Sequence, residues 1–192
     1  MRLDAIEKPK NLMLKMGYKM MQKQFGKVLT PLKIIYARKP SLMMIAQKID
    51  KTSSKLSLDP SFRLLIQTFA SMTNGCHFCH DFRQTQVIKN KLGTEKFEAL
   101  INYHSSHSFS ARERAALAYV EATIKDKHVS DKTFSELKKH FTDVEIIELT
   151  WINAAESYYN SLMIPLGIES DHLRELVLLP KKLSWMSLFG LG

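Results

Sequence analysis

The stretch LDPSFRLLIQTFASMTNGCHFC, residues 58–79, decides the fold of this chain. It opens with a helix start, because Asp59 can cap free backbone amides and Pro60 suits the first helical position. Apolar residues then recur at helical spacing, namely Phe62, Leu65, Ile66, Phe69 and Met72. Gly75 suits the left-handed position just past a helix end, so a new helix is expected to begin around Cys76. The stretch therefore predicts two consecutive helices with a cysteine at their junction.

Helix signals recur along the rest of the chain, whereas strand-like alternation is scarce. Ser110-x-x-Glu113 and Thr142-x-x-Glu145 fit the capping box, in which side chain and backbone satisfy each other's free groups. Only seven glycines and six prolines interrupt the 192 residues, a length sufficient for one domain with a sizeable core. We therefore expect an all-α protein built as a single helical domain.

Positive charge is concentrated in the first quarter of the sequence. The formal net charge is +9, and residues 1–50 hold eleven lysines and arginines against three acidic residues. This region contains an expected helix whose apolar stripe consists of Leu12, Met13, Met16, Met20 and Met21. We expect the stripe to pack against the core or a neighbouring subunit while the lysines stay solvated. Binding to a membrane surface or to nucleic acid is the less favoured interpretation.

The ends of the sequence bear on its location. The chain has no run of about 18 apolar residues, so no membrane-spanning helix is expected. Residues 1–26 carry Asp4 and Glu7 and spread lysines through the part of a signal peptide that should be apolar. We therefore expect a cytoplasmic protein whose cysteines are kept as a dithiol. The apolar stretch of residues 183–191 is expected to dock on its own or an adjacent subunit.

Both cysteines of the chain lie in NGCHFCHDF, residues 74–82. In the first turn of a helix, free amides and the helix dipole favour an anion and so lower the pKa of a thiol. The spacing of three residues places the sulfurs of Cys76 and Cys79 on one face, close enough to pair as a reversible disulfide. Arg83 lies one turn beyond Cys79 and adds positive charge. Either His80 or His77 can take or return a proton.

Three other interpretations of this stretch remain open. Residues 76–80 spell the C-x-x-C-H motif of haem attachment, but that modification requires an exported protein. A zinc site requires about four ligands, and only His104 and His107 are spaced to supplement the cysteines. The third interpretation is a pair of small buried cysteines without chemistry, since free cysteine is among the most buried residue types. We expect no metal and no cofactor.

From about Phe25 to Ile168 the sequence resembles the carboxymuconolactone decarboxylase family, and more closely its alkyl hydroperoxidase D-like branch. The resemblance rests above all on NGCxxC after an apolar helix. It extends through FSARERAALAYVEATIKD (109–126), VSDKTFSELKKHFTDVEIIELTWINA (129–154) and YYNSLMIPLGI (158–168). It implies a helical fold assembled into homotrimers or homohexamers. Residues 26–168 would form the family domain, between a basic Met-rich helical extension at 1–25 and a C-terminal helix with an apolar tail at 169–192.

The resemblance also implies roles for the cysteines. Cys79 corresponds to the thiol that attacks a peroxide and Cys76 to the resolving thiol, after which an external dithiol protein resets the disulfide. Leu64 stands where the family has a glutamate, and Arg83 where it has a histidine; together those two residues form the family's proton relay. A base must then come from elsewhere in the chain. The candidates, in order of preference, are His80, His77 and Glu156.

Two functional hypotheses follow from the sequence. The first is a cytosolic thiol peroxidase or disulfide oxidoreductase in antioxidant defence, acting on a hydroperoxide or a disulfide. The second is a non-catalytic or redox-sensing oligomer of the same fold that has lost the Glu/His relay. The decarboxylation that names the family is less favoured, because those members generally lack the cysteine pair.

Overall fold

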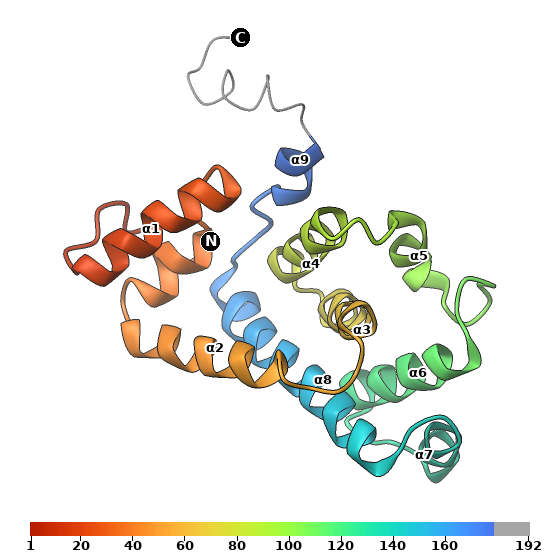
Figure 1. Ribbon diagram of the computed structural model, residues 1–192. Helices are drawn as coiled ribbons and strands as arrows, with labels where there is room; N and C mark the ends of the chain where they lie inside the picture. The colour runs from red at the N-terminus through yellow and green to blue at the C-terminus, as the bar shows by residue number, and fades with distance from the viewer. Residues whose placement is uncertain (179–192) are drawn as a thin grey trace.

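The computed structural model describes residues 1–178, and every element within that range is helical (Figure 1). The helices are α1 (Leu12–Phe25), α2 (Pro40–Ser53), α3 (Pro60–Thr73), α4 (His77–Lys89), α5 (Thr94–Glu98), α6 (Ala111–Lys125), α7 (Asp131–Lys138), α8 (Asp143–Met163) and α9 (Leu173–Leu178). Three shorter segments connect them: the π-helix η1 (Leu32–Tyr36) and the 3-10 helices η2 (Ala99–Asn102) and η3 (Ile164–Leu166). The expected single all-α domain is confirmed for these residues. None of the described helices has the length and apolar character to cross a membrane.

The helix α3 runs through the centre of the bundle, in contact with α4, α6 and α8 (Figure 1). Its side chains Leu65, Ile66 and Phe69 are buried, and they share one core with Leu117 of α6 and Leu149 of α8. Burial of one such side chain contributes roughly 1.5–3 kcal/mol to stability. The apolar stripe predicted from the sequence therefore holds the surrounding helices in place.

Capping groups fix where the helices begin. Asp59 accepts hydrogen bonds from the amides of Ser61 and Phe62, at 2.8 and 3.2 Å, and Pro60 is the first residue of α3. Both capping boxes expected from the sequence are present, at the starts of α6 and α8. The helix starts predicted from these signals are therefore confirmed. They could be predicted from the sequence because each cap depends only on residues within one helical turn.

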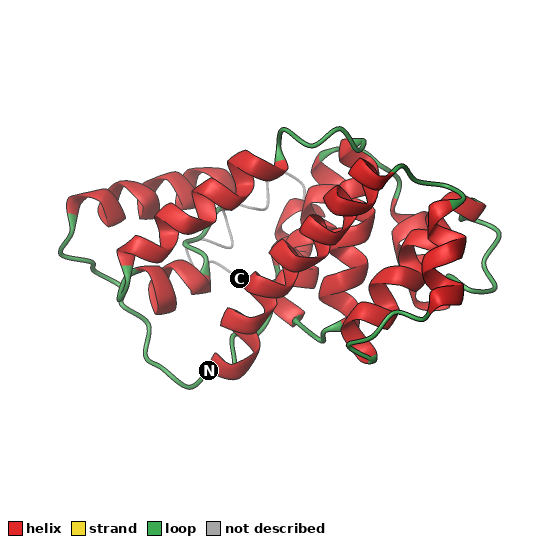
Figure 2. Cartoon of the chain, turned by 90° about the horizontal axis from the view of Figure 1, so that it is seen from below, coloured by secondary structure: helices red, strands yellow, loops and turns green. Residues whose placement is uncertain are grey.

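The helices α1 and α2 lie at one end of the molecule, on the left of Figures 1 and 2. The buried residues of α1 are Leu14 and Tyr18, which pack with Leu32 of η1. The Tyr18 hydroxyl also donates a 2.5 Å hydrogen bond to the backbone oxygen of Ile6. The residues before and after α1 therefore fold back onto its Leu14–Tyr18 face.

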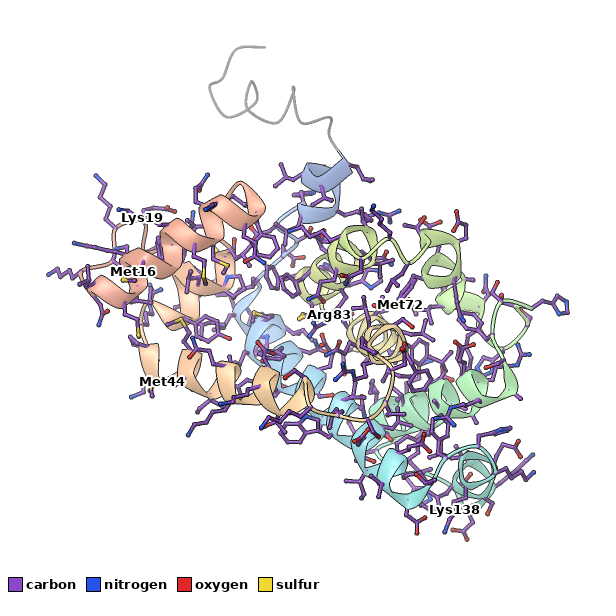
Figure 3. The ribbon with its side chains drawn as sticks, viewed as in Figure 1. Met16, Lys19, Met44, Met72, Arg83 and Lys138 are labelled. Carbon is purple, nitrogen blue, oxygen red and sulfur yellow. A yellow bond between two sulfur atoms is a disulfide. The ribbon has the colours of Figure 1, made fainter. Side chains whose placement is uncertain are left out.

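The methionine stripe of α1 does not pack on the core of this chain, which was one of the two places expected for it; packing against a neighbouring subunit stays a prediction. The side chains of Leu12, Met13, Met16 and Met20 are exposed, and Met16 lies on the outer side of α1 in Figure 3. Only Met21 of the stripe is partly buried. The physical reason is that η1 and residues 1–11 cover the neighbouring face, a contact that the periodicity of α1 alone does not encode.

The segment after α8 returns across α4 and meets the N-terminus. The amide of Arg2 donates to the oxygen of Leu166 at 3.0 Å. The carboxylate of Asp81, on α4, accepts hydrogen bonds from the Ser170 hydroxyl and from the amides of residues 173 and 174, each at 2.9 Å. Asp81 thus supplies the cap for α9 and holds it on α4. The apolar stretch 183–191 and its expected docking lie outside the described residues.

Candidate redox site

The two cysteines meet where α3 ends and α4 begins. Gly75 has a φ of +71°, the left-handed conformation expected for it, and turns the chain between the helices. Cys76 is the N-cap of α4, and its Sγ accepts a hydrogen bond from the amide of Cys79 at 3.3 Å. A disulfide joins Cys76 and Cys79, whose Cα atoms are 5.3 Å apart. The structure therefore shows the oxidised form of the pair at a helix N-terminus.

Both cysteines are buried in this state, with Cys76 2% and Cys79 4% exposed. Their surroundings differ because the residues of α4 fall on two faces. At 3.6 residues per turn, positions 78, 79, 82 and 83 share one face, and positions 77, 80, 81 and 84 share the opposite one. The first set, which contains Cys79, lines one cavity. The second set lines another cavity together with Cys76.

The cavity beside Cys79 has a volume of about 310 Å³ and lies between α1, η1, α2, α4 and α8. Most of its wall is apolar, with thioether, aliphatic and aromatic side chains that include Met20, Met21, Leu32, Phe78 and Phe82. Its polar side chains come from Tyr36, Gln47, Asp50, Arg83, Glu156 and Tyr159. This combination of an apolar wall with a few convergent polar groups is typical of a small-molecule site.

Arg83 and Glu156 form an ion pair within this wall. Arg83 donates from Nε and Nη2 to the same oxygen, Oε2 of Glu156, at 3.0 and 2.6 Å. Glu156 is 1% exposed, and Asn160 donates to its other oxygen at 3.3 Å. The Nη1 atom of Arg83 donates to Gln86 at 2.9 Å. A buried carboxylate is therefore compensated by an arginine that stands one turn from Cys79.

Two tyrosines add hydroxyl groups to the same cavity. Tyr159 donates to Asp50 at 3.1 Å, and burial together with the charge of Asp50 raises the pKa of Tyr159 well above its usual range. Burial raises the pKa of Tyr36 to about 12, with smaller contributions from Tyr158 and Asp50. Both hydroxyls therefore stay protonated at neutral pH. Neither tyrosine was predicted from the sequence as a site residue, although Tyr159 follows Glu156 by three positions and so shares its side of α8.

The hollow beside Cys76 is more polar and has a volume of about 460 Å³. It is formed by the end of α3, the second face of α4 and residues 170–175, and His80 lies in its wall. Burial lowers the pKa of His80, while a hydrogen bond to the backbone of Thr68 acts in the opposite direction. The Nδ1 atom of His80 is buried and makes no hydrogen bond within residues 1–178. His80 is therefore a neutral base near Cys76.

The remaining candidates occupy distinct places. His77 is exposed, and its Nδ1 lies 2.6 Å from Glu169, at the rim of the hollow beside Cys76. Leu64 is buried in α3 and supplies no titratable group at the position of the family's glutamate. The structure therefore brings Cys79, Arg83 and Glu156 to one cavity, and Cys76, His80 and His77 to the other.

The histidines proposed to supplement a zinc site lie apart from the cysteines. His104 is on the segment between η2 and α6, and its Nε2 lies 3.1 Å from Glu121. His107 is exposed on the same segment. In the part of the chain that the structure describes, no three His, Cys, Asp or Glu side chains are grouped so that they could hold a metal ion.

Comparisons with known proteins agree with this architecture. Residues 45–122, from α2 to α6, match the Carboxymuconolactone decarboxylase family. The uncharacterized protein YdfG of Bacillus subtilis is 25% identical over 134 residues, which cover 69% of this chain and 91% of YdfG.

Solved structures of the same fold include an Agrobacterium tumefaciens protein of unknown function with a proposed AhpD-type antioxidant defence role. It has 26% identity and a TM-score of 0.67, and the match covers 71% of this chain and 96% of that protein. The debrominase Bmp8 has 19% identity and a TM-score of 0.73, over 87% of this chain and 90% of Bmp8. At that identity Bmp8 is similar in fold alone, which illustrates that one fold carries different chemistries.

Proposed function

The chain belongs to the carboxymuconolactone decarboxylase family, with an AhpD-like fold, and from this premise we propose that it reduces hydroperoxides through Cys79 and Cys76. The observation that carries the proposal is the disulfide at the N-terminus of α4, with Cys79 on the wall of an apolar cavity. An antioxidant role is also proposed for the Agrobacterium tumefaciens relative. Electron exchange between thiol and disulfide partners is the closely related reaction of the same pair.

In the proposed cycle, the Cys79 thiolate attacks the outer oxygen of a hydroperoxide, which gives a Cys79 sulfenic acid and, after protonation, an alcohol. The Cys76 thiol then displaces water from the sulfenic sulfur, and the disulfide forms. An external dithiol protein returns two electrons and two protons. The reductant is itself left as a disulfide, so the cycle balances.

The groups around Cys79 suggest how its thiolate is stabilised without the family's relay. Arg83 lies four residues along α4, a spacing that brings Cβ atoms within roughly 5–6 Å. Its guanidinium keeps its charge at any physiological pH, and Glu156 holds it in place from α8. In this proposal Arg83 favours the thiolate, and Glu156 is a positioning residue.

A second function is favoured by one observation, the buried Leu64 at the position of the family's glutamate. Without that carboxylate the protein can act as a slow redox sensor, oxidised by peroxide but not turned over. We further propose that residues 26–168 form the family domain, that the protein assembles into homotrimers or homohexamers, and that it works in the cytosol, where dithiol reductants are maintained.

The test compares the reduced wild type with Cys79→Ser and Cys76→Ser. With tert-butyl hydroperoxide and a dithiol donor, we expect steady consumption by the wild type and none by Cys79→Ser. Cys76→Ser should react once and stop as a sulfenic acid, which dimedone labels. If the wild type consumes neither tert-butyl hydroperoxide nor hydrogen peroxide with any dithiol donor, the peroxidase function is wrong.

A sensor gives a different result in the same assay. Its wild type forms the disulfide with one equivalent of peroxide, but consumption does not continue when the dithiol is added. The extent of steady turnover therefore separates the two functions.

A further inference from the structure

The disulfide separates two cavities that lie on opposite faces of α4. Cys79 is in the wall of the apolar cavity, which includes Phe78 and Phe82. Cys76 is in the wall of the polar hollow, which includes Gln84 and His80. Neither cysteine is in both walls. A molecule that enters one cavity therefore meets a different sulfur from a molecule that enters the other.

Each cysteine has a different charged or titratable neighbour one turn along the helix. The amide of His80 donates to the backbone oxygen of Cys76 at 2.9 Å, so these two residues are stacked at i and i+4. Arg83 has the same relation to Cys79. An arginine stabilises negative charge but does not release a proton, whereas a histidine exchanges protons near neutral pH. Of these two neighbours, the one that can transfer a proton is thus on the side of Cys76.

We propose that the polar hollow is where a dithiol reductant reaches the disulfide, that the reductant attacks the sulfur of Cys76, and that His80 carries the proton of the attacking thiol to Cys76. The inference rests on the proposed function, because it concerns the step that resets the same cysteine pair. It assigns the oxidising substrate and the reductant to opposite sides of α4.

The exchange proceeds in two displacements. His80 takes a proton from the first reductant thiol, and the resulting thiolate bonds to Cys76 Sγ. The Cys76–Cys79 bond breaks, and Cys79 leaves as a thiolate on the side of Arg83. The second reductant thiol then forms the reductant's own disulfide and gives its proton through solvent to Cys79. Cys76 leaves as a thiolate and receives the proton held by His80.

The surroundings of His80 and Cys76 suit these roles. Because burial lowers the pKa of His80, its ring is neutral at pH 7 and can accept a proton. The charged and titratable groups around it are His77 and Asp81 on α4, and Arg174 and Glu175 on α9. When Cys76 leaves, its sulfur already accepts the Cys79 amide, which stabilises a thiolate at the helix N-terminus.

The first test measures the reductive half-reaction alone. Oxidised protein is mixed with dithiothreitol in the absence of peroxide, and the free thiols are counted by alkylation and mass spectrometry. We expect His80→Gln to slow reduction about tenfold or more at pH 7 and to remove an inflection from its pH–rate profile. His107→Gln, an exposed histidine outside the site, should match the wild type.

The oxidative half-reaction is the internal comparison. Reduced His80→Gln should lose a clearly smaller fraction of its rate in disulfide formation with tert-butyl hydroperoxide than in reduction by dithiothreitol. An equal loss in both half-reactions, or an unchanged rate of reduction in His80→Gln, would overturn the assignment of His80.

The second test locates the attacked sulfur and needs no variant of this protein. A thioredoxin with only its nucleophilic cysteine is mixed with the oxidised wild type, the reaction is quenched in acid, and the mixed disulfide is mapped by peptide mass. We expect the bond at Cys76, with Cys79 free; a bond at Cys79 overturns the proposal. Because no peroxide is present, these results hold or fail independently of the peroxidase assay.

Discussion

Arg83 and Glu156 meet in the interior of the protein, where Nε and Nη2 of the arginine lie 3.0 and 2.6 Å from one carboxylate oxygen. The pair joins α4 to α8 across 73 positions of sequence, and Arg83 is labelled near the centre of the molecule in Figure 3. Asn160 and Gln86 occupy further hydrogen-bonding positions of the two side chains. The helix α4 is therefore fixed to α8 directly beside the cavity of Cys79.

Breaking this pair from one side should destabilise the protein strongly. Glu156→Leu leaves the Arg83 charge without a partner in the interior, and Arg83→Met does the same to Glu156. Each single change should lower the free energy of unfolding by about 3–5 kcal/mol, whereas the double change should recover most of that loss. Urea unfolding of the wild type, the two single variants and the double variant measures the coupling free energy between Arg83 and Glu156.

An exposed pair serves as the control for that cycle. Lys125 and Glu121 are paired on the surface of α6, and Lys125→Met should leave the urea midpoint nearly unchanged. Additive losses in the double variant of Arg83 and Glu156 would mean that the two side chains stabilise the fold independently.

The size of the cavity beside Cys79 should set substrate preference. Ala46 of α2 lies in its wall, and Ala46→Phe would occupy part of the 310 Å³. We predict that the rate of oxidation by cumene hydroperoxide falls at least about tenfold relative to the rate with hydrogen peroxide, because only the larger molecule needs that space. Stopped-flow measurement on reduced protein gives both rates. The control is Ala154→Phe, at an exposed position of α8 outside the cavity, and equal losses with both peroxides would show that the cavity does not bind the substrate.

Two glycines of the α1 region should respond oppositely to the same substitution. Gly17 is inside α1, where a Cβ would lie 3.9 Å from Leu32 in ordinary contact, so Gly17→Ala should stabilise by about 0.5–1 kcal/mol. Gly26 ends the helix at φ +75°, and Gly26→Ala should destabilise by a similar amount although no atom lies near the added methyl. Thermal unfolding of both variants measures the shift in Tm, which should be positive for Gly17→Ala and negative for Gly26→Ala. Two shifts of the same sign would contradict this account of α1.

Local sequence signals predicted well where the helices begin and where the chain turns between α3 and α4. Asp59, Gly75 and the two capping boxes each act within a turn of helix, so their positions follow from neighbouring residues alone. The methionine stripe of α1 is exposed within this chain, because η1 and residues 1–11 cover a different face. Amphipathic periodicity indicates that a face can be buried but does not say which segment will cover it.

The site was predictable in part. The i to i+4 spacing already places Arg83 beside Cys79 and His80 beside Cys76, so the two faces of α4 can be read from the sequence once its start is known. The burial of Glu156 could not be predicted, since its partner is 73 residues away and the pairing depends on how α8 crosses α4. The same holds for Asp81, whose hydrogen bonds reach the residues just before and within α9.

Removing the Asp81 carboxylate should loosen α9 without unfolding the bundle. The amides of Leu173 and Arg174 lose their acceptor in Asp81→Ala, so α9 should open more often. We expect amide hydrogen exchange in residues 173–178 to accelerate about tenfold, while α3 keeps its protection. Asp126→Ala, at an exposed position after α6, is the control. Unchanged exchange in α9 would mean that its apolar contacts with α4 suffice to hold it.

The half-buried imidazole of His80 should make stability depend on pH. Burial holds its folded pKa below the unfolded value of about 6.5, so on acidification the unfolded chain takes up this proton before the folded one. The stabilising contribution is complete above that value and is lost as pH falls through the window below it, by at most about 1.4 kcal/mol per pH unit. Urea unfolding at pH 7.5 and 5.5 should therefore show a larger loss for the wild type than for His80→Gln. The exposed His107→Gln should retain the wild-type difference, because the other titrating groups are common to all three proteins. A variant of His80 that loses as much stability as the wild type would show that the imidazole takes up its proton as readily in the folded protein as in the unfolded chain.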